Sequence, residues 1–143
     1  MKIKTNELTG TQLDWAVATC EGLPIRHDPM NFGRAFPEGG FWVWDDRGPI
    51  GKRDYRLIGR QYCPSTNWAQ GGPIIEREKI EIVRGNDLIF PNGNEKGEYI
   101  EPLWLASCGG GRMFHGPTSL VAAMRAFAAL KLGDEIEIPE ELR

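Results

Sequence analysis

The chain has 143 residues and a formal net charge of −3, with 41% hydrophobic and 26% charged residues. This length and composition predict one globular domain spanning residues 1–143, and the acidic balance argues against a protein that coats nucleic acid. The start, MKIKTNELTG, has no signal-peptide pattern and no apolar run is long enough to span a bilayer, so we expect a cytoplasmic protein without a membrane partner.

The first predicted helix begins at Thr9 and runs to about Glu21. Thr9 and Gln12 have the spacing of a capping box, and Gly22 is placed to end the helix. Apolar residues recur on one face of this helix, and we expect Asp14 on the solvated face.

Residues 23–40 are rich in proline and glycine, which predicts a long ordered loop. We interpret His27 within it as a surface histidine that pairs with solvent or with Asp28. The aromatic and β-branched stretch Phe41–Trp44 predicts a strand, and residues 55–62 predict a second one.

The segment from Arg47 to Arg60 is strongly basic. Its cations are interleaved with Tyr55 and Tyr62, which resembles a nucleic-acid-binding surface in composition. The other interpretation is the solvent face of an antiparallel sheet, in which the same side chains are simply hydrated. The basic residues are Arg47, Lys52, Arg53, Arg56 and Arg60.

A second helix is predicted in the string PSTNWAQGGPIIERE. Ser65 or Thr66 is the expected cap, and Trp68 is expected either half exposed at the edge of this helix or in the core. Because Pro73 has no N–H and crowds the preceding turn, we expect the helix to kink or restart there. The alternation that follows predicts a strand ending near Gly85.

Further along the chain, Asn92 and Gly93 predict a turn, and residues 99–107 predict a central strand. The glycine-rich stretch Cys108–His115 predicts a flexible connection into the next helix.

The longest helix is predicted over Gly116–Gly133, and we expect it to be the core element of the fold. Ala, Leu and Met favour helix, and a helix that is apolar on nearly all faces must be buried. Either Gly116 caps it with Pro117 in the first turn, or Thr118 is the cap, and Gly133 ends it. The expected core face consists of Leu120, Val121, Met124, Phe127 and Ala128.

Residues 134–143 alternate acids with isoleucine and predict an acidic, extended C-terminal segment laid on the domain. Together the elements predict an α+β fold in which helices pack against a small, mostly antiparallel sheet. Cys20, Cys63 and Cys108 are an odd and widely spaced set in a chain without an export signal, so we expect reduced thiols. Because these cysteines lack the spacing of a metal site, we expect no metal, and we expect no other cofactor.

Three stretches carry a resemblance to a known family: LTGTQLDWAVATCEG (residues 8–22), YCPSTNWAQGGPIIERE (62–78) and GPTSLVAAMRAFAALKLGDEIEIPEEL (116–142). In the same order and across almost the whole chain, they resemble small tailed-phage proteins typified by NinX, a family of unknown function. More loosely, the order of elements is similar to the phage α-β-α sandwich domain. The resemblance implies a phage origin, in an infected or lysogenic bacterial host, and a fold, but no reaction.

The glycine-rich stretch Cys108–Ser119 is the enzyme-like candidate. A helix N-terminus together with Arg112, His115, Thr118 and Ser119 could hold a phosphate or carboxylate. No Lys-Ser or Lys-Thr pair follows the glycines, so the phosphate-loop signature is absent. The alternative is a mobile loop leading into an ordinary helix cap.

The leading functional hypothesis is a phage accessory protein that binds a partner, most simply a host or phage protein, and it assigns no catalytic residues. The candidate binding residues are Asn67, Trp68, Arg112, His115 and Thr118. On one edge of the fold they would form a mixed surface with Trp68 as its apolar anchor. Alternatively, Asn67 only caps a helix, Trp68 is core, and Arg112 and His115 are solvated. The other hypotheses are a nucleic-acid-associated factor using the Arg47–Arg60 stretch and a small enzyme using the Cys108–Ser119 stretch.

Overall fold

The computed structural model describes residues 2–28, 40–45, 54–85, 88–89, 98–99, 103–109 and 111–142. Helices and short antiparallel strands follow one another along these residues, which confirms the predicted α+β class. The helices are α1 (Gly10–Cys20), α2 (Trp68–Glu78) and α3 (Ser119–Leu132), with the 3-10 helices η1 (Thr5–Glu7) and η3 (Glu140–Leu142). The strands are β1 (Lys2–Lys4), β2 (Ile25–Asp28), β3 (Gly40–Asp45), β4 (Asp54–Leu57), β5 (Glu81–Arg84), β6 (Leu88–Ile89), β7 (Glu98–Tyr99), β8 (Trp104–Ser107), β9 (Phe114–Gly116) and β10 (Glu135–Glu137).

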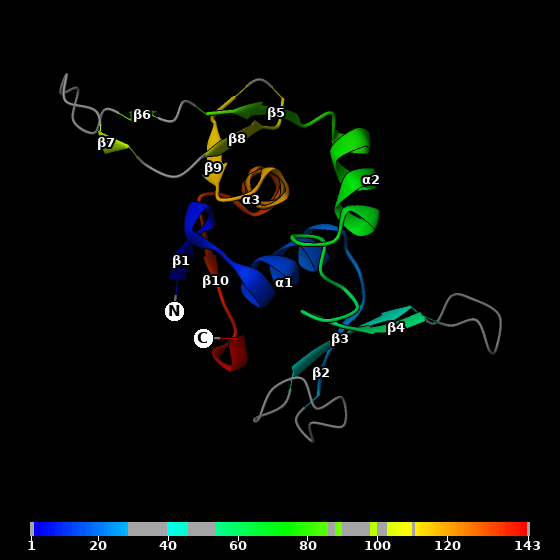
Figure 1. The fold of residues 1–143 in the computed structure, drawn as a ribbon. Coiled ribbons are helices and arrows are strands. Elements are labelled where there is room, and N and C mark those ends of the chain that lie inside the picture. Colours follow the sequence, from blue (N-terminus) through cyan, green and yellow to red (C-terminus); the bar gives the residue numbers. More distant parts are fainter. Residues whose placement is uncertain are drawn as a thin grey trace.

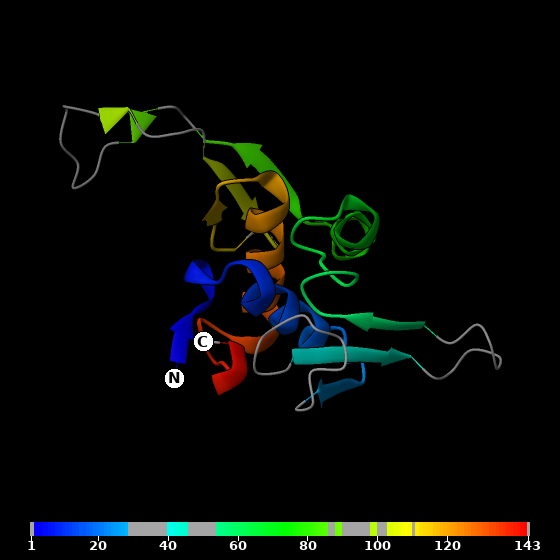
Figure 2. The same cartoon turned by 60° about the horizontal axis from the view of Figure 1, so that its bottom comes forward.

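The strands are divided among small sheets with the orders β1-β10, β2-β3-β4, β5-β8-β9 and β6-β7. In Figure 1, α3 is seen end-on in the middle of the molecule, with the β5-β8-β9 sheet on one side and α1 on the other. Figure 2 shows the β2-β3-β4 sheet on the side of α1 that faces away from β5-β8-β9. The rings of Trp15 in α1 and Phe41 in β3 meet edge to face at 6.5 Å, so the sheet packs on this helix.

Helix α3 is the core element, as its composition predicts. Every residue from Leu120 to Ala128 is buried, including the whole expected core face. The helix begins at Ser119 because the Thr118 side chain accepts the Val121 N–H at 3.1 Å, so the alternative start at Gly116 and Pro117 is wrong. Gly133 ends the helix with a φ of 93°, a backbone conformation that favours glycine.

The start of α1 differs from the capping box predicted for it. Thr9 is the N-cap, but its side chain makes no capping hydrogen bond. Gln12 Nε2 instead donates to the carbonyl of Leu142 at 2.9 Å, so a tertiary partner takes the amide that the local motif would have used. Near the same chain end, β10 pairs with β1, with Ile136 opposite Ile3, so residues 135–137 of the predicted C-terminal segment are extended, whereas residues 140–142 form η3.

Residues 23–40 are not loop throughout, because Ile25–Asp28 forms β2 against β3. His27 lies opposite Phe41 with ring centroids 5.1 Å apart, and its Nε2 is 3.7 Å from Glu141 Oε1 in η3. Among the described residues, the carboxylate beside His27 is therefore that of Glu141. The side chain of Asp28 and residues 29–39 lie outside the described residues.

The other predicted strands are found over part or all of their predicted length. The strand at Phe41–Trp44 is confirmed as β3, whereas the one predicted over residues 55–62 ends at Leu57. Of the strand predicted over 99–107, the structure describes β8 and the end of β7, and the Asn92-Gly93 turn lies outside the described residues. The connection predicted to be flexible contains β9, because residues 114–116 pair with β8.

Candidate functional site

Helix α2 is capped at its N-terminus by Asn67, whose Oδ1 accepts the N–H of Ala69 at 2.9 Å. The prediction that Ser65 or Thr66 caps the helix is wrong. The Ser65 N–H is occupied by the carboxylate of Asp14, which accepts it at 2.9 Å, so the turn before α2 is anchored to α1. Asn67, one of the predicted site residues, thus has a structural role as the N-cap of α2.

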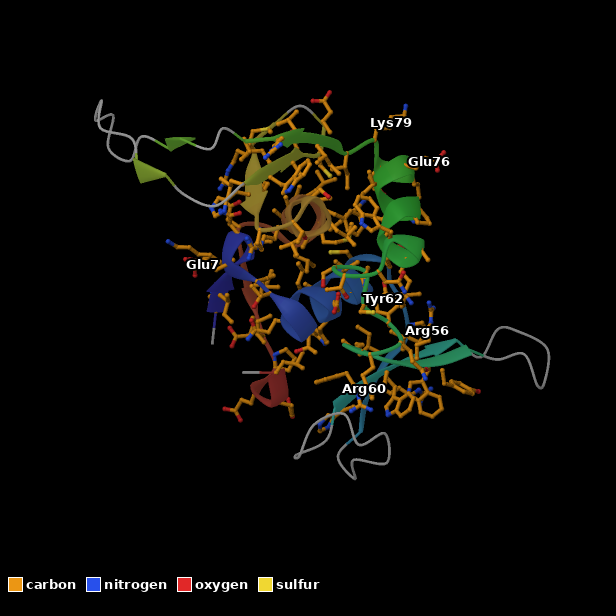
Figure 3. The ribbon with its side chains drawn as sticks, in the orientation of Figure 1. Glu7, Arg56, Arg60, Tyr62, Glu76 and Lys79 are labelled. Atoms are coloured by element: carbon orange, nitrogen blue, oxygen red, sulfur yellow. The ribbon has the colours of Figure 1, made fainter. Side chains whose placement is uncertain are left out.

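Helix α2 continues through Pro73, so the predicted restart of the helix there is wrong. A proline removes one helical hydrogen bond, and the preceding turn of α2 is closely packed at Gly71. A Cβ on Gly71 would come 2.5 Å from Leu120 Cδ1 and 2.5 Å from the Pro64 carbonyl oxygen, so the absence of a side chain lets α2 approach the start of α3. Figure 3 shows Glu76 and Lys79 at the opposite end of α2, pointing away from the core.

The starts of α2 and α3 enclose a hollow of about 210 Å³, which we call the α2–α3 hollow. It is lined by Ser65, Thr66, Trp68, Thr118, Ser119, Leu120 and Val121. Trp68 is 55% exposed, so the expectation of a half-exposed tryptophan is confirmed and the alternative core position is wrong. The described residues of this lining present hydroxyl groups and apolar surface, and none of them has an ionisable side chain.

Asp14 lies behind Ser65. It is buried, so the prediction that it lies on the solvated face is wrong. Burial raises the pKa of Asp14 from 3.8 to about 6, and hydrogen bonding from Ser65 opposes part of the rise. The carboxyl group therefore carries most of a negative charge at neutral pH and loses it in mildly acidic solution. The physical reason for the burial is tertiary, since the turn that contains Ser65 covers this face of α1.

Arg112 lies outside the α2–α3 hollow. Its guanidinium forms an ion pair with Asp134 and lies 5.4 Å from the ring centroid of Phe114. These three residues border two other hollows, one toward the C-terminal half of α3 and one toward β1 and η1. The structure therefore brings Trp68 and Thr118 together, with Asn67 next to them, but gives Arg112 a different neighbourhood.

The side chain of His115 is exposed on β9, and the backbone of this residue makes hydrogen bonds to two other side chains. Its N–H donates to Asn6 Oδ1 at 3.2 Å, and its carbonyl accepts from Arg125 Nη1 at 2.8 Å. The side chains of Asn6 and Arg125 thus occupy the N–H and the carbonyl of His115 on the edge strand β9. Without them, these backbone groups would be free to pair with another chain. The backbone of His115 is thus a structural element, and the ring is not among the residues that line the α2–α3 hollow.

Arg125 is a second buried charge that the sequence reasoning missed. It is 5% exposed, and its Nε donates to the Leu8 carbonyl at 2.8 Å in addition to the bond with His115. Burial lowers the pKa of this guanidinium, with a smaller opposing effect from Glu7. A lone arginine within an otherwise apolar helix was the available signal, because such a residue needs buried acceptors.

The two alternative sites have less support in the geometry. Burial raises the pKa of the Cys108 thiol, and Glu78 raises it further, which leaves less of the nucleophilic thiolate. In the described part of the chain, no three potential metal-ligating side chains are grouped closely enough to hold an ion. Within the basic stretch, Arg56 stacks 5.1 Å from the ring centroid of Tyr62 (Figure 3). Three other residues of the basic stretch lie outside the described residues, namely Arg47, Lys52 and Arg53.

The fold and the hollow together define an α+β protein with an uncharged surface recess beside an exposed tryptophan. Among the described residues, no helix has the length and apolar character needed to cross a membrane. The sequence model of the family described as Bacteriophage P22, NinX matches residues 4–131. The chain belongs to this bacteriophage family, which confirms the resemblance carried by its three stretches and makes it a phage accessory protein. A comparison with curated proteins found no match.

Proposed function

We propose that this phage accessory protein acts by binding a partner protein in the cytoplasm of the infected or lysogenic bacterium. The α2–α3 hollow with Trp68 is the docking site. The observation that carries this proposal is the exposure of Trp68, which is 55% accessible at the rim of the hollow. Tryptophan combines a large apolar surface with a polar N–H, and it is enriched among the residues that dominate binding energy at interfaces.

The chemistry of the lining supports a protein partner over a nucleic acid. A site for nucleic acid presents cations to the phosphate backbone, and among the described residues that line the hollow there is no lysine or arginine. Leu120 and Val121 supply apolar surface at the base, and Thr66, Thr118 and Ser119 supply hydroxyl groups. This combination of an apolar centre and a polar rim is typical of protein interfaces.

The test uses two variants that each remove one exposed apolar side chain from a different place. Trp68→Ala changes the rim of the hollow, and Leu130→Ala changes a side chain that is 54% exposed near the far end of α3. Each tagged protein is captured from infected cells, and the co-purified proteins are quantified. We expect Trp68→Ala to lose a defined partner by about tenfold or more, because a central tryptophan often contributes 2 kcal/mol or more. Leu130→Ala should retain it.

Thermal melting of both variants separates a binding effect from a folding effect. Equal recovery of every partner by Trp68→Ala and the parent would contradict the proposed site. Capture that depends on nucleic acid, and is abolished by nuclease, would favour the nucleic-acid hypothesis instead, and its strength should then fall steeply with salt.

A further inference from the structure

Two hollows adjoin at the Arg112–Asp134 ion pair. Both are lined by Arg112, Phe114 and Asp134. The first, which we call the α3 hollow, has a volume of about 220 Å³ and extends toward the C-terminal half of α3. The second, the β1 hollow, has a volume of about 550 Å³ and extends toward β1 and η1. Because the two share these lining residues, they form one depression that the ion pair divides.

The α3 hollow is mainly apolar beyond the ion pair. Phe114, which is buried, lines it together with Ala126, Ala129 and Leu130 from α3. The remaining described lining residues are Cys108 and Gly111. A cavity of about 150 Å³ can hold one benzene ring, so this hollow has room for one apolar side chain of the size of leucine. A side chain placed there would remove apolar surface of both molecules from water.

The β1 hollow presents charges of both signs. Its charged lining residues are Lys4, Arg112, Asp134 and Glu135. Asn6 also lines it, and while the Oδ1 of this amide accepts the His115 N–H, its Nδ2 has no acceptor among the described residues. With two cations and two carboxylates, the described lining has no net charge, so an ion of either sign would meet as many repulsive as attractive charges. A zwitterion, which carries both signs, can pair with both kinds of group.

The ion pair itself is available to a ligand. The side chains of Arg112 and Asp134 are 66% and 64% exposed, and an exposed ion pair adds little to stability, so charges from a ligand can replace it at small cost. The guanidinium of Arg112 also lies 5.4 Å from the ring centroid of Phe114, which favours its position beside the apolar hollow. A planar guanidinium presents pairs of parallel N–H donors, the arrangement that a carboxylate accepts.

We propose that this depression binds a free α-amino acid with an apolar side chain. The carboxylate of the ligand accepts hydrogen bonds from Arg112, its ammonium group donates to Asp134, and its side chain packs on Phe114 in the α3 hollow. One carbon atom of an α-amino acid carries all three groups, and the guanidinium, the carboxylate and the apolar hollow of the protein likewise meet at one place. The site shares no described lining residue with the α2–α3 hollow, so this binding function goes beyond the proposed docking of a partner.

The test compares four probes on the full chain. L-leucine carries all three groups, 4-methylpentanoate lacks the ammonium group, 3-methylbutylamine lacks the carboxylate, and glycine lacks the side chain. Each is titrated while the amide signals of Gly111 and Ala129, which line the α3 hollow, are followed by NMR. We expect saturable shifts with L-leucine and binding at least about tenfold tighter than that of each other probe, because loss of one charge-assisted hydrogen bond or of the buried side chain weakens binding by about this factor.

Two variants identify the charges that hold the ligand. Arg112→Gln should weaken L-leucine binding about tenfold and should not weaken binding of 3-methylbutylamine, which has no carboxylate. Asp134→Asn should weaken L-leucine binding to a similar extent and should not weaken binding of 4-methylpentanoate. Arg26→Gln is the matched control, because the exposed Arg26 guanidinium also lies near an aromatic ring, 5.6 Å from the centroid of Trp44, but lines neither hollow. It should leave L-leucine binding unchanged.

Thermal melting shows whether each variant is folded, and the comparison of probes on the parent chain decides the question without any variant. The inference is overturned if L-leucine gives no saturable shift, if any of the other three probes binds as tightly, or if folded Arg112→Gln keeps the affinity of the parent. The first of these outcomes would show that Arg112 and Asp134 form a surface ion pair only. L-leucine binding together with no Trp68-dependent capture would support the amino-acid site and contradict only the proposed docking.

Discussion

The two ends of α3 each lie beside an exposed apolar side chain, but their polar surroundings differ. At the N-terminal end, Trp68 borders a hollow whose described lining residues are apolar or carry hydroxyl groups, and none of them is ionisable. At the C-terminal end, Leu130 borders a hollow where Arg112 and Asp134 satisfy one another in an ion pair. The difference teaches that exposure alone does not characterise a surface, because the described residues around the two exposed side chains are uncharged at one end and paired charges at the other.

The largest expected effect is on stability, and it separates the buried body of α3 from its C-terminal end. Ala123→Asp places a charge at a fully buried position and should lower the free energy of unfolding by about 3 kcal/mol or more, and Ala126→Asp should behave alike. Leu130→Asp, at an exposed position on the same helix, should lower it by less than about 1 kcal/mol. Denaturant unfolding measures all three, and parent-like values for both buried variants would show that α3 is not the core.

The carboxyl group behind the hollow should make stability depend on pH. The folded pKa of Asp14, about 6, lies above the ordinary value of 3.8, so its favourable contribution is complete below that value and is lost as the pH rises through 6. Two pKa units correspond to about 3 kcal/mol. Relative to the parent, the Asp14→Asn variant should therefore gain about 2–3 kcal/mol of unfolding free energy between pH 4 and pH 7. A difference that stays constant over this interval would show that Asp14 is not buried as described.

Two arginines provide a smaller test of the same contrast. Arg125→Met removes the donors to the Leu8 and His115 carbonyls and should destabilise the protein by about 2 kcal/mol, since it leaves buried acceptors unpaired. Arg112→Met removes an exposed ion pair with Asp134 and an exposed contact with the Phe114 ring, and it should change stability by about 1 kcal/mol or less. Equal losses in the two variants, measured by thermal unfolding, would remove the distinction between a structural and a surface arginine.

The smallest expected effects concern the close packing of α2 on the start of α3. Gly71→Ala inserts a methyl group into Leu120 and the Pro64 carbonyl and should cost about 1–2 kcal/mol. The neighbouring Gly72→Ala meets no atom within 4 Å and should stabilise the helix by up to about 1 kcal/mol. Opposite signs in a paired unfolding experiment are the expected outcome, and two stabilising substitutions would show that the helices are not in close contact here.

Local patterns predicted well where the deciding interaction is itself local. The composition of residues 119–132 identified the core helix, and the aromatic run at Phe41–Trp44 identified a strand. Half exposure of Trp68 and the capping role of Thr118 were among the stated alternatives. For the cap the partner is three residues away, and for the helix and the strand the propensity is carried by consecutive residues, so the sequence contains the information.

Several of the wrong predictions have a different cause, which is a partner outside the local segment. Gln12 bonds to Leu142, and Asp14 is buried by Ser65. The glycine-rich segment before α3 contains a strand because β8 pairs with it. No periodicity within the segment could reveal these partners, since each is supplied by a distant element.

By itself, the sequence determined the α+β class, the central helix and membership in the phage family, because helix propensity, burial pattern and family-specific strings are carried by consecutive residues. Only the tertiary structure decided that the starts of α2 and α3 meet, that Arg112 lies elsewhere, and that Asp14 lies beneath the hollow. The physical reason is that desolvation and unpaired hydrogen-bond donors are properties of the packed state. They arise when distant segments exclude water from each other, and a linear pattern does not contain them.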